Sequence, residues 1–203
     1  SFLWIFATFY NIGYMRALDE HAQTRYYTCF AIAIIGAQGV SYSGSLFSLY
    51  LFYEIITIFT YPLVAHHQDE EGYAGAKKYI VYLMGTSKGL LLPATILTYV
   101  FTGTLDFSDD IVKGIFSKGT DGVWITVTYG LFLFGFAKAA IMPLHNWLPS
   151  AMVAPTPVSA LLHAVAVVKA GVFCISRVML SVFGLELLQS LNLGLYTAYL
   201  VSF

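Results

Sequence analysis

The chain has very little charge for its length. Only 10% of its 203 residues are charged, whereas 58% are hydrophobic and the mean hydropathy is +0.73. Soluble domains carry about a quarter of their residues as charged side chains, so this chain has too few to cover a surface exposed to water. The composition therefore excludes a soluble globular protein and predicts an integral membrane protein.

An excess of positive charge and the common catalytic motifs are also lacking. The net charge is −1 and the pI is about 6.5, so no basic face is expected to bind nucleic acid. We find no glycine-rich nucleotide loop, no iron–sulfur spacing and no nucleophile motif. No cofactor and no redox or hydrolytic chemistry are therefore expected in this chain, and whether it belongs to an enzyme complex stays open.

Cysteine and metal-ligand patterns are sparse. The two cysteines, Cys29 and Cys174, lie in apolar stretches without a CxxC spacing, which favours small buried hydrophobes over a disulfide or a metal site. His66 and His67 adjoin each other, but no cysteine or suitably spaced ligand accompanies them. The sequence therefore predicts no metal site at these histidines.

Clusters of charge divide the chain into apolar runs that are about long enough to cross a bilayer, which takes about 20 residues. The sequence predicts an all-α, polytopic transmembrane helix bundle of about seven helices, forming a single domain over residues 1–203. The chain lacks an initiator methionine and stops inside an apolar run, so we expect a fragment of a longer chain. The predicted runs are residues 1–15, 26–42, 46–65, about 79–102, 123–142, about 156–180 and 185 onward, with the longest polar connection at 103–122.

Several of these runs contain ionisable residues. Lys138 lies near the end of its run, Lys169 lies within the next run, and Glu54 lies within the third. A cationic side chain costs a few kcal/mol at the centre of a spanning helix. Ionisable residues inside a membrane therefore indicate function, and Lys88 and His163 are two further candidates in the same kind of segment.

Prolines concentrate directly after Lys138. Residues 143–157 hold four of the six prolines of the chain, and each proline removes a backbone donor and resists continuation of a helix. We expect the helix to break about one turn after Lys138, which places the ammonium beside freed carbonyl groups. Broken helices at membrane depth are tolerated only against protein or a wet cavity.

Together these residues predict a proton route. Desolvation lowers the pKa of a lysine and raises that of a glutamate, whereas pairing the two opposes both shifts. If Glu54 and Lys138 meet, Glu54 can act as a modulating acid and Lys138 as a switchable proton carrier. His163 and Lys169 would relay the proton onward, since the ordinary pKa of histidine lies near neutrality. Lys88 is either a further relay or a structural residue.

Two interpretations of another class remain open. One is a quinone-binding membrane subunit, which predicts a sizeable cavity lined by aromatic side chains. The other is a non-conducting scaffold, in which Glu54 and Lys138 only neutralise each other.

A long segment around Lys138 resembles a known family. The sequence FGFAKAAIMPLHNWLPSAMVAPTPVSALLHAVAVVKAGVF is similar to the antiporter-like subunits of respiratory complex I, membrane-bound hydrogenases and Mrp-type cation/proton antiporters. The upstream LFYEIITIFTYPLV resembles the glutamate-bearing fifth helix of that family. The pairing of His163 with Lys169 favours the Mrp branch, and the whole is most similar to the D-type subunit of that branch.

The resemblance implies a larger architecture and a set of roles. It implies that the chain covers family helices three to nine of about fourteen, with residues of about 26–180 forming the first of two inverted repeats. Glu54, Lys138, His163 and Lys169 then match the family's proton-translocating residues, whereas Lys88 stands where small or apolar residues are usual. The implied partners are other membrane subunits of a complex and protons, with or without Na⁺ or K⁺. The expected location is the lipid bilayer of a bacterial inner membrane, which the chain crosses several times.

Overall fold

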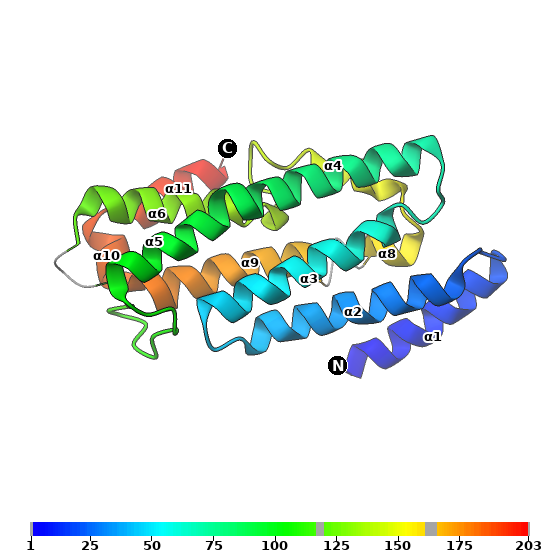
Figure 1. Cartoon of the computed structure of the whole chain (residues 1–203), viewed down its shortest axis with the longest axis horizontal. Coiled ribbons are helices and arrows are strands. Elements are labelled where there is room, and N and C mark those ends of the chain that lie inside the picture. Colours follow the sequence, from blue (N-terminus) through cyan, green and yellow to red (C-terminus); the bar gives the residue numbers. More distant parts are fainter. Residues whose placement is uncertain (1, 117–119, 161–165, 203) are drawn as a thin grey trace.

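The computed structural model describes residues 2–116, 120–160 and 166–202, which form helices joined by turns (Figure 1). In this described part, the only β-type pairing given is an isolated bridge between Ser45 and Asp106. The predicted all-α class is confirmed. The helices are α1 (Phe2–Ala17), α2 (Gln23–Tyr42), α3 (Leu46–Val64), α4 (Glu70–Thr86), α5 (Leu92–Thr102), α6 (Gly122–Gly135), α7 (Trp147–Ser150), α8 (Thr156–Ala160), α9 (Val167–Val178), α10 (Gly184–Ser190) and α11 (Leu193–Ser202).

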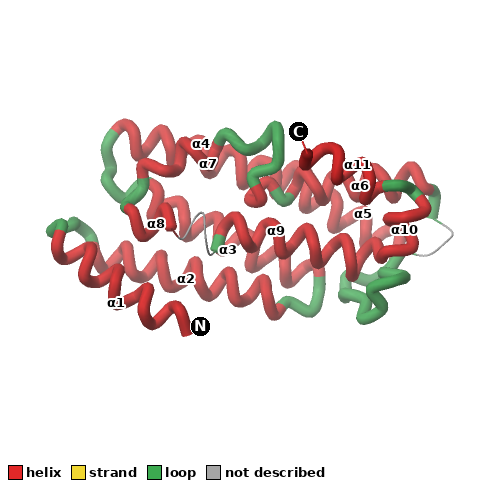
Figure 2. Tube along the Cα trace, turned by 180° about the vertical axis from the view of Figure 1, so that it is seen from behind, coloured by secondary structure: helices red, strands yellow, loops and turns green. Residues whose placement is uncertain are grey.

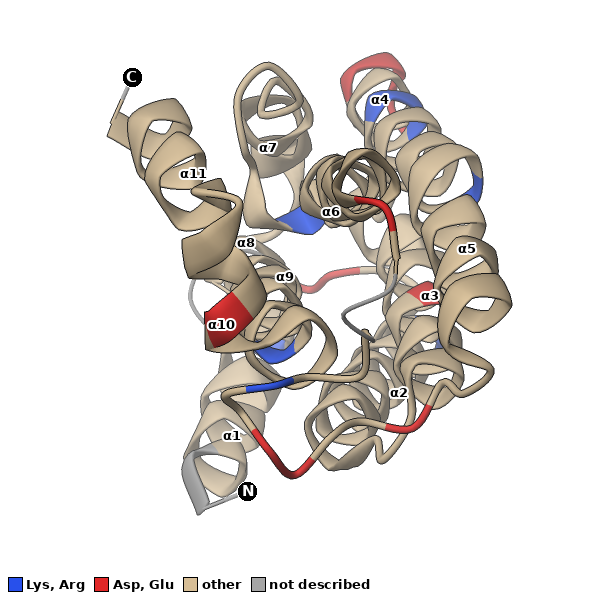
Figure 3. Ribbon diagram, turned by 90° about the vertical axis from the view of Figure 1, so that its left-hand side faces the viewer, with Lys and Arg blue, Asp and Glu red and all other residues tan. Residues whose placement is uncertain are grey.

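Among the residues that the structure describes, three helical stretches are long and apolar enough to cross a membrane. They are Leu46–Val64, Glu70–Thr102 and Val167–Ser190. The second stretch joins α4 to α5 through a π-helical turn, Ser87–Leu91. The shorter α6 and α11 are also apolar. The long helices lie side by side along the longest axis of the molecule, with α2 against α3 and α3 against α4 (Figures 1 and 2). Most of the helical ribbon carries neither acidic nor basic side chains (Figure 3).

Polar side chains begin the two central helices. Ser45 caps α3 by accepting a hydrogen bond of 3.2 Å from the backbone N–H of Ser48. Asp69 caps α4 by accepting one of 2.7 Å from the N–H of Gly72. Glu70 and Glu71 occupy the first turn of α4, where negative charge is favoured by the helix dipole. The acidic run after α3 is therefore the start of a helix and not only a polar loop.

The helix that leads to Lys138 ends earlier than the prolines require. The structure ends α6 at Gly135, gives Phe136 a non-helical conformation and makes Ala137–Ala139 a short 3₁₀ turn. The predicted break is confirmed, but its predicted position one turn after Lys138 is wrong. The α-helical hydrogen-bonding pattern stops before the lysine because groups from other elements bind the freed backbone.

The helix expected over residues of about 156–180 is also interrupted. α8 ends at Ala160, residues 161–165 lie outside the described part, and Ala166 is the N-cap of α9. Lys169 is therefore in the first turn of α9. The last run begins at Leu193 and not at 185, because Asn192 adopts a positive φ of 53° and turns the chain after α10.

Two glycines allow the broken segment to pack closely on its neighbours. A Cβ atom at Gly171 of α9 would lie 2.4 Å from the backbone nitrogen of Ala139, and one at Gly135 would lie 2.9 Å from that of Leu91. No real Cβ atom tolerates such distances to a backbone. The position of Lys138 therefore depends on backbone contacts with α9 and with the π-helical turn.

Gly171→Ala should destabilise the protein by about 1–3 kcal/mol, because the added methyl group overlaps the backbone of Ala139. Gly130→Ala in α6 is the matched control, since its Cβ would meet no atom within 4 Å. Thermal unfolding of the purified full-length protein in detergent measures the difference. Equal melting temperatures for the two variants would show that the close approach of α9 is unimportant.

Candidate functional site

Lys138 is completely buried. Its relative exposure is 0%, which makes it one of the largest fully buried side chains in the described part of the chain. It lies in the 3₁₀ turn between α6 and the proline-rich segment, and α9 packs against that turn. A charge enclosed in this way needs specific polar partners, because desolvation of an ammonium group is expensive.

Tyr53 of α3 supplies those partners. The Lys138 ammonium donates a hydrogen bond to the backbone carbonyl of Tyr53 and lies over its ring, with Nζ 3.4 Å from the ring centroid. The Tyr53 hydroxyl accepts a hydrogen bond of 3.3 Å from the backbone N–H of Lys138. One buried residue thus binds both the side chain and the main chain of the lysine, and the ring adds a cation–π attraction.

Trp147 binds a backbone carbonyl at the helix break. The indole N–H of Trp147, at the start of α7, donates a hydrogen bond of 3.1 Å to the backbone carbonyl of Ala137. Trp147 is 0% exposed and packs edge-on against Tyr79 of α4. The backbone groups of the broken segment therefore have protein partners, which is what allows an interrupted helix at membrane depth.

Glu54 is the next residue after Tyr53 on α3. Its carboxylate accepts a hydrogen bond from the hydroxyl of Ser87, the first residue of the π-helical turn. Single π-helical turns inside α-helices are frequent at functional sites. In the part of the chain that the structure describes, no ion pair joins Glu54 to Lys138.

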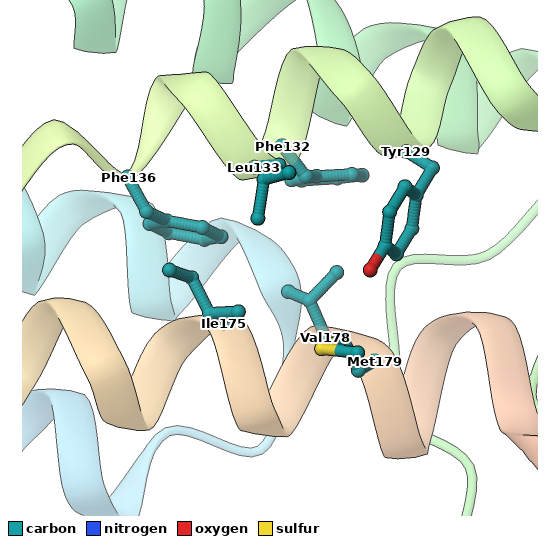
Figure 4. Close-up of a pocket in the computed structure, with 7 residues that line it drawn as sticks. All are labelled: Tyr129, Phe132, Leu133, Phe136, Ile175, Val178 and Met179. Carbon is teal, nitrogen blue, oxygen red and sulfur yellow. The ribbon is translucent and has the colours of Figure 1, made fainter. Parts of the chain in front are cut away.

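The space between α6 and α9 beside Lys138 is apolar and tight. The cavity there has a volume of about 10 Å³, which is at the lower limit for one water molecule. The Tyr129 hydroxyl, the one polar side-chain group shown there, shares a 2.6 Å hydrogen bond with Thr197. This cavity is far too small for a quinone, since ligand sites measure about 300–1,000 Å³. Figure 4 shows its lining: Tyr129, Phe132, Leu133, Phe136, Ile175, Val178 and Met179.

Two other predicted residues that the structure describes, Lys88 and Lys169, are not brought to the buried Lys138. Lys88 is exposed on the π-helical turn, next to the buried Ser87. Lys169 is exposed on α9, and because it lies two residues from Gly171 it faces about 200° away from the contact with Ala139. His163 lies outside the described residues. Both cysteines are buried and free, as predicted.

Sequence reasoning missed the residues that hold Lys138. Tyr53 adjoins Glu54, and Trp147 lies between two of the prolines, but nothing in either pattern indicates that the side chain binds the backbone of a distant segment. Ser87 was missed for the same reason, because a serine in an apolar helix usually bonds within its own helix.

The sequence of the chain matches a known protein family. Residues 43–200 match the family described as NADH:quinone oxidoreductase/Mrp antiporter, TM. A chloroplastic NAD(P)H-quinone oxidoreductase subunit 5 from Phaseolus vulgaris is 34% identical over 181 residues, which are 86% of this chain and 24% of that protein.

Solved structures of two membrane complexes share the fold. A chain of an archaeal membrane-bound sulfane sulfur reductase is 30% identical with a TM-score of 0.71, over 85% of this chain and 35% of its own. A chain of the Mrp complex from a Dietzia species is 30% identical with a TM-score of 0.66, over 74% of this chain and 16% of its own. The chain thus spans about a third or less of each of these three relatives. It is an integral, multi-pass membrane protein and belongs to the NADH:quinone oxidoreductase/Mrp antiporter transmembrane family.

Proposed function

We propose that this chain is part of a proton-translocating membrane subunit of a multi-subunit cation/proton antiporter of the Mrp type. The observation that carries the proposal is the complete burial of Lys138 at a helix break, with Tyr53 as its direct partner and Glu54 within electrostatic reach. A buried lysine releases its proton when its stabilising contacts are lost, because desolvation disfavours the ammonium form. Lys138 is the proton carrier in this proposal.

Glu54 is the modulating acid. Its carboxylate can turn between the Ser87 hydroxyl, its partner in this structure, and the Lys138 ammonium. Approach to Lys138 holds the proton on the lysine, and return to Ser87 weakens that hold. The absence of a direct ion pair between these two described residues is one of the two arrangements that such a switch needs.

Lys169, His163 and Lys88 are the proposed onward relay. Lys88 and Lys169 are exposed on this chain but lie in helices apolar enough to span a membrane. A lysine facing lipid is costly, so we propose that other protein segments and bound water cover both side chains in the complete assembly. We propose that the partners of the chain are other membrane subunits and protons, with or without Na⁺ or K⁺.

The Mrp assignment rests on His163 and Lys169 in the segment HAVAVVKAGVF and on the 30% identity to a chain of an Mrp complex. The alternative is the homologous subunit of an NADH:quinone oxidoreductase or a membrane-bound hydrogenase, which the Phaseolus relative favours. We propose residues of about 26–180 as the first inverted repeat and a bacterial inner membrane as the location. The buried lysine has the same role in each alternative.

Lys138→Ala in the full-length subunit should reduce proton transport to background, because no other described side chain takes the place of the buried ammonium. The measurement is acid-quench fluorescence in inverted membrane vesicles, with assembly of the complex checked by native electrophoresis. Lys77→Ala is the matched control, since Lys77 is exposed in the first half of α4. Undiminished transport by a fully assembled Lys138→Ala complex would exclude Lys138 as the carrier.

Lys138→Arg distinguishes a carrier from a scaffold. An arginine keeps the positive charge but does not release its proton inside a protein, so we expect an assembled complex without transport. A non-conducting scaffold would instead tolerate Lys138→Arg, and it would also tolerate joint replacement of Glu54 and Lys138 by apolar residues.

Tyr53→Phe should destabilise the protein by about 1–3 kcal/mol, because the buried backbone N–H of Lys138 loses its acceptor. The ring and the backbone carbonyl of residue 53 remain, so we expect assembly with a lowered melting temperature. Tyr99→Phe is the control, since Tyr99 is 56% exposed. If both variants melt at the wild-type temperature, the Tyr53 hydroxyl does not hold the break in place.

A further inference from the structure

A second cluster of ligand-type side chains lies away from Lys138. Glu20 and His21 come from the turn between α1 and α2, and His66 comes from the turn after α3. The candidate ligand atoms of these three residues all lie within 4.8 Å of one another. The Glu20 carboxylate is 3.4 Å from Nε2 of His66 and 3.9 Å from Nδ1 of His21. Two turns that are far apart in the sequence thus converge on one point.

The imidazole of His66 is buried without a hydrogen-bond partner. Its side chain is 0% exposed, yet neither of its ring nitrogens has a hydrogen-bond partner in the described part of the chain. Nε2 faces the Glu20 carboxylate at 3.4 Å without hydrogen-bond alignment. The ring stacks on His21, with 4.9 Å between centroids. A buried polar group without a partner costs about 1–3 kcal/mol, so it indicates a ligand that the protein atoms alone do not supply.

We propose that Glu20, His21 and His66 bind a divalent transition-metal ion, with Zn²⁺ as the best fit. Imidazole nitrogens and one carboxylate are typical zinc ligands. With metal–ligand bonds of about 2.0–2.2 Å, neighbouring ligands of a tetrahedral zinc ion lie about 3.3 Å apart. The separation of 3.4 Å between Glu20 and His66 already matches that value. The His21 ring, which stacks on His66 and lies 3.9 Å from Glu20, must turn out of the stack to direct a nitrogen at the same ion, and its half-exposed side chain has room to do so.

The surroundings suit a metal ion at the membrane surface. The three residues lie in polar turns outside the spanning stretches. His67 is a further neighbour of Glu20. Its Nδ1 is 3.9 Å from the Glu20 carboxylate, and its side chain is 38% exposed. Water or His67 would complete the coordination.

Sequence reasoning set aside a metal site at His66 and His67 because no ligand lies nearby in the chain. The fold supplies the missing ligands from the turn before α2. A metal ion bound there would join the α1–α2 hairpin to the end of α3. This role is independent of proton transfer at Lys138, so failure of either proposal leaves the other standing.

The direct test is the metal content of the purified full-length subunit in its complex. The complex is stripped with a chelator, dialysed against Zn²⁺ and analysed by mass spectrometry of the metals. Wild type should retain one Zn²⁺ more than His66→Gln, and affinity should fall by about tenfold or more in Glu20→Gln and His21→Gln. His145→Gln is the control, because His145 is an exposed histidine far from the cluster in sequence.

A second measurement separates the loss of metal binding from misfolding of a variant. Zn²⁺ should raise the melting temperature of the wild-type and His145→Gln complexes and leave that of Glu20→Gln unchanged, since Glu20 retains 14% side-chain exposure and tolerates an amide of the same shape. Wild-type complex that binds no Zn²⁺ above the level of His66→Gln, or Glu20→Gln that binds it equally well, would overturn the proposal.

Discussion

The contact between the Lys138 ammonium and Tyr53 is the interaction on which the rest of the site depends. It places a positive charge in a fully buried position and satisfies it with a carbonyl group and an aromatic ring, without neutralising it. A lysine held by neutral partners stays sensitive to any approaching carboxylate. Glu54 accepts a hydrogen bond from Ser87 and is not paired with Lys138 in this structure. In the proposed switch, Glu54 is the carboxylate that approaches Lys138.

Helix breaking and close packing create the place for this charge. The end of α6 at Gly135 brings Lys138 to the centre, and Gly171 lets the backbone of α9 contact the turn that carries it. Trp147 donates a second hydrogen bond to the Ala137 carbonyl, which also accepts one from the backbone N–H of Ala140. Much of this part of the structure is apolar and tightly filled, as the small cavity between α6 and α9 shows (Figure 4).

Hydropathy and charge were enough to predict an all-helical membrane protein and the approximate positions of its long apolar helices, because crossing a bilayer imposes a length and a composition on each one. They were also enough to single out Glu54 and Lys138, since charge in an apolar run is visible without a structure. They could not place the end of α6 at Gly135 or the start of α9 at Val167. Both boundaries depend on side chains and backbones that lie far away in the sequence.

The same limit explains what was missed around the sites. Tyr53 and Trp147 act through contacts with segments 85 and 10 residues away, and His66 meets Glu20 only in the folded chain. The most direct test of the central claim is a cryo-electron-microscopy map of the whole complex in lipid that resolves bound water. The account predicts ordered water within hydrogen-bonding distance of the Lys138 ammonium and the Glu54 carboxylate, continuing toward Lys169. A Lys138 amine enclosed by carbon atoms on every side, with no water between it and Glu54, would contradict it.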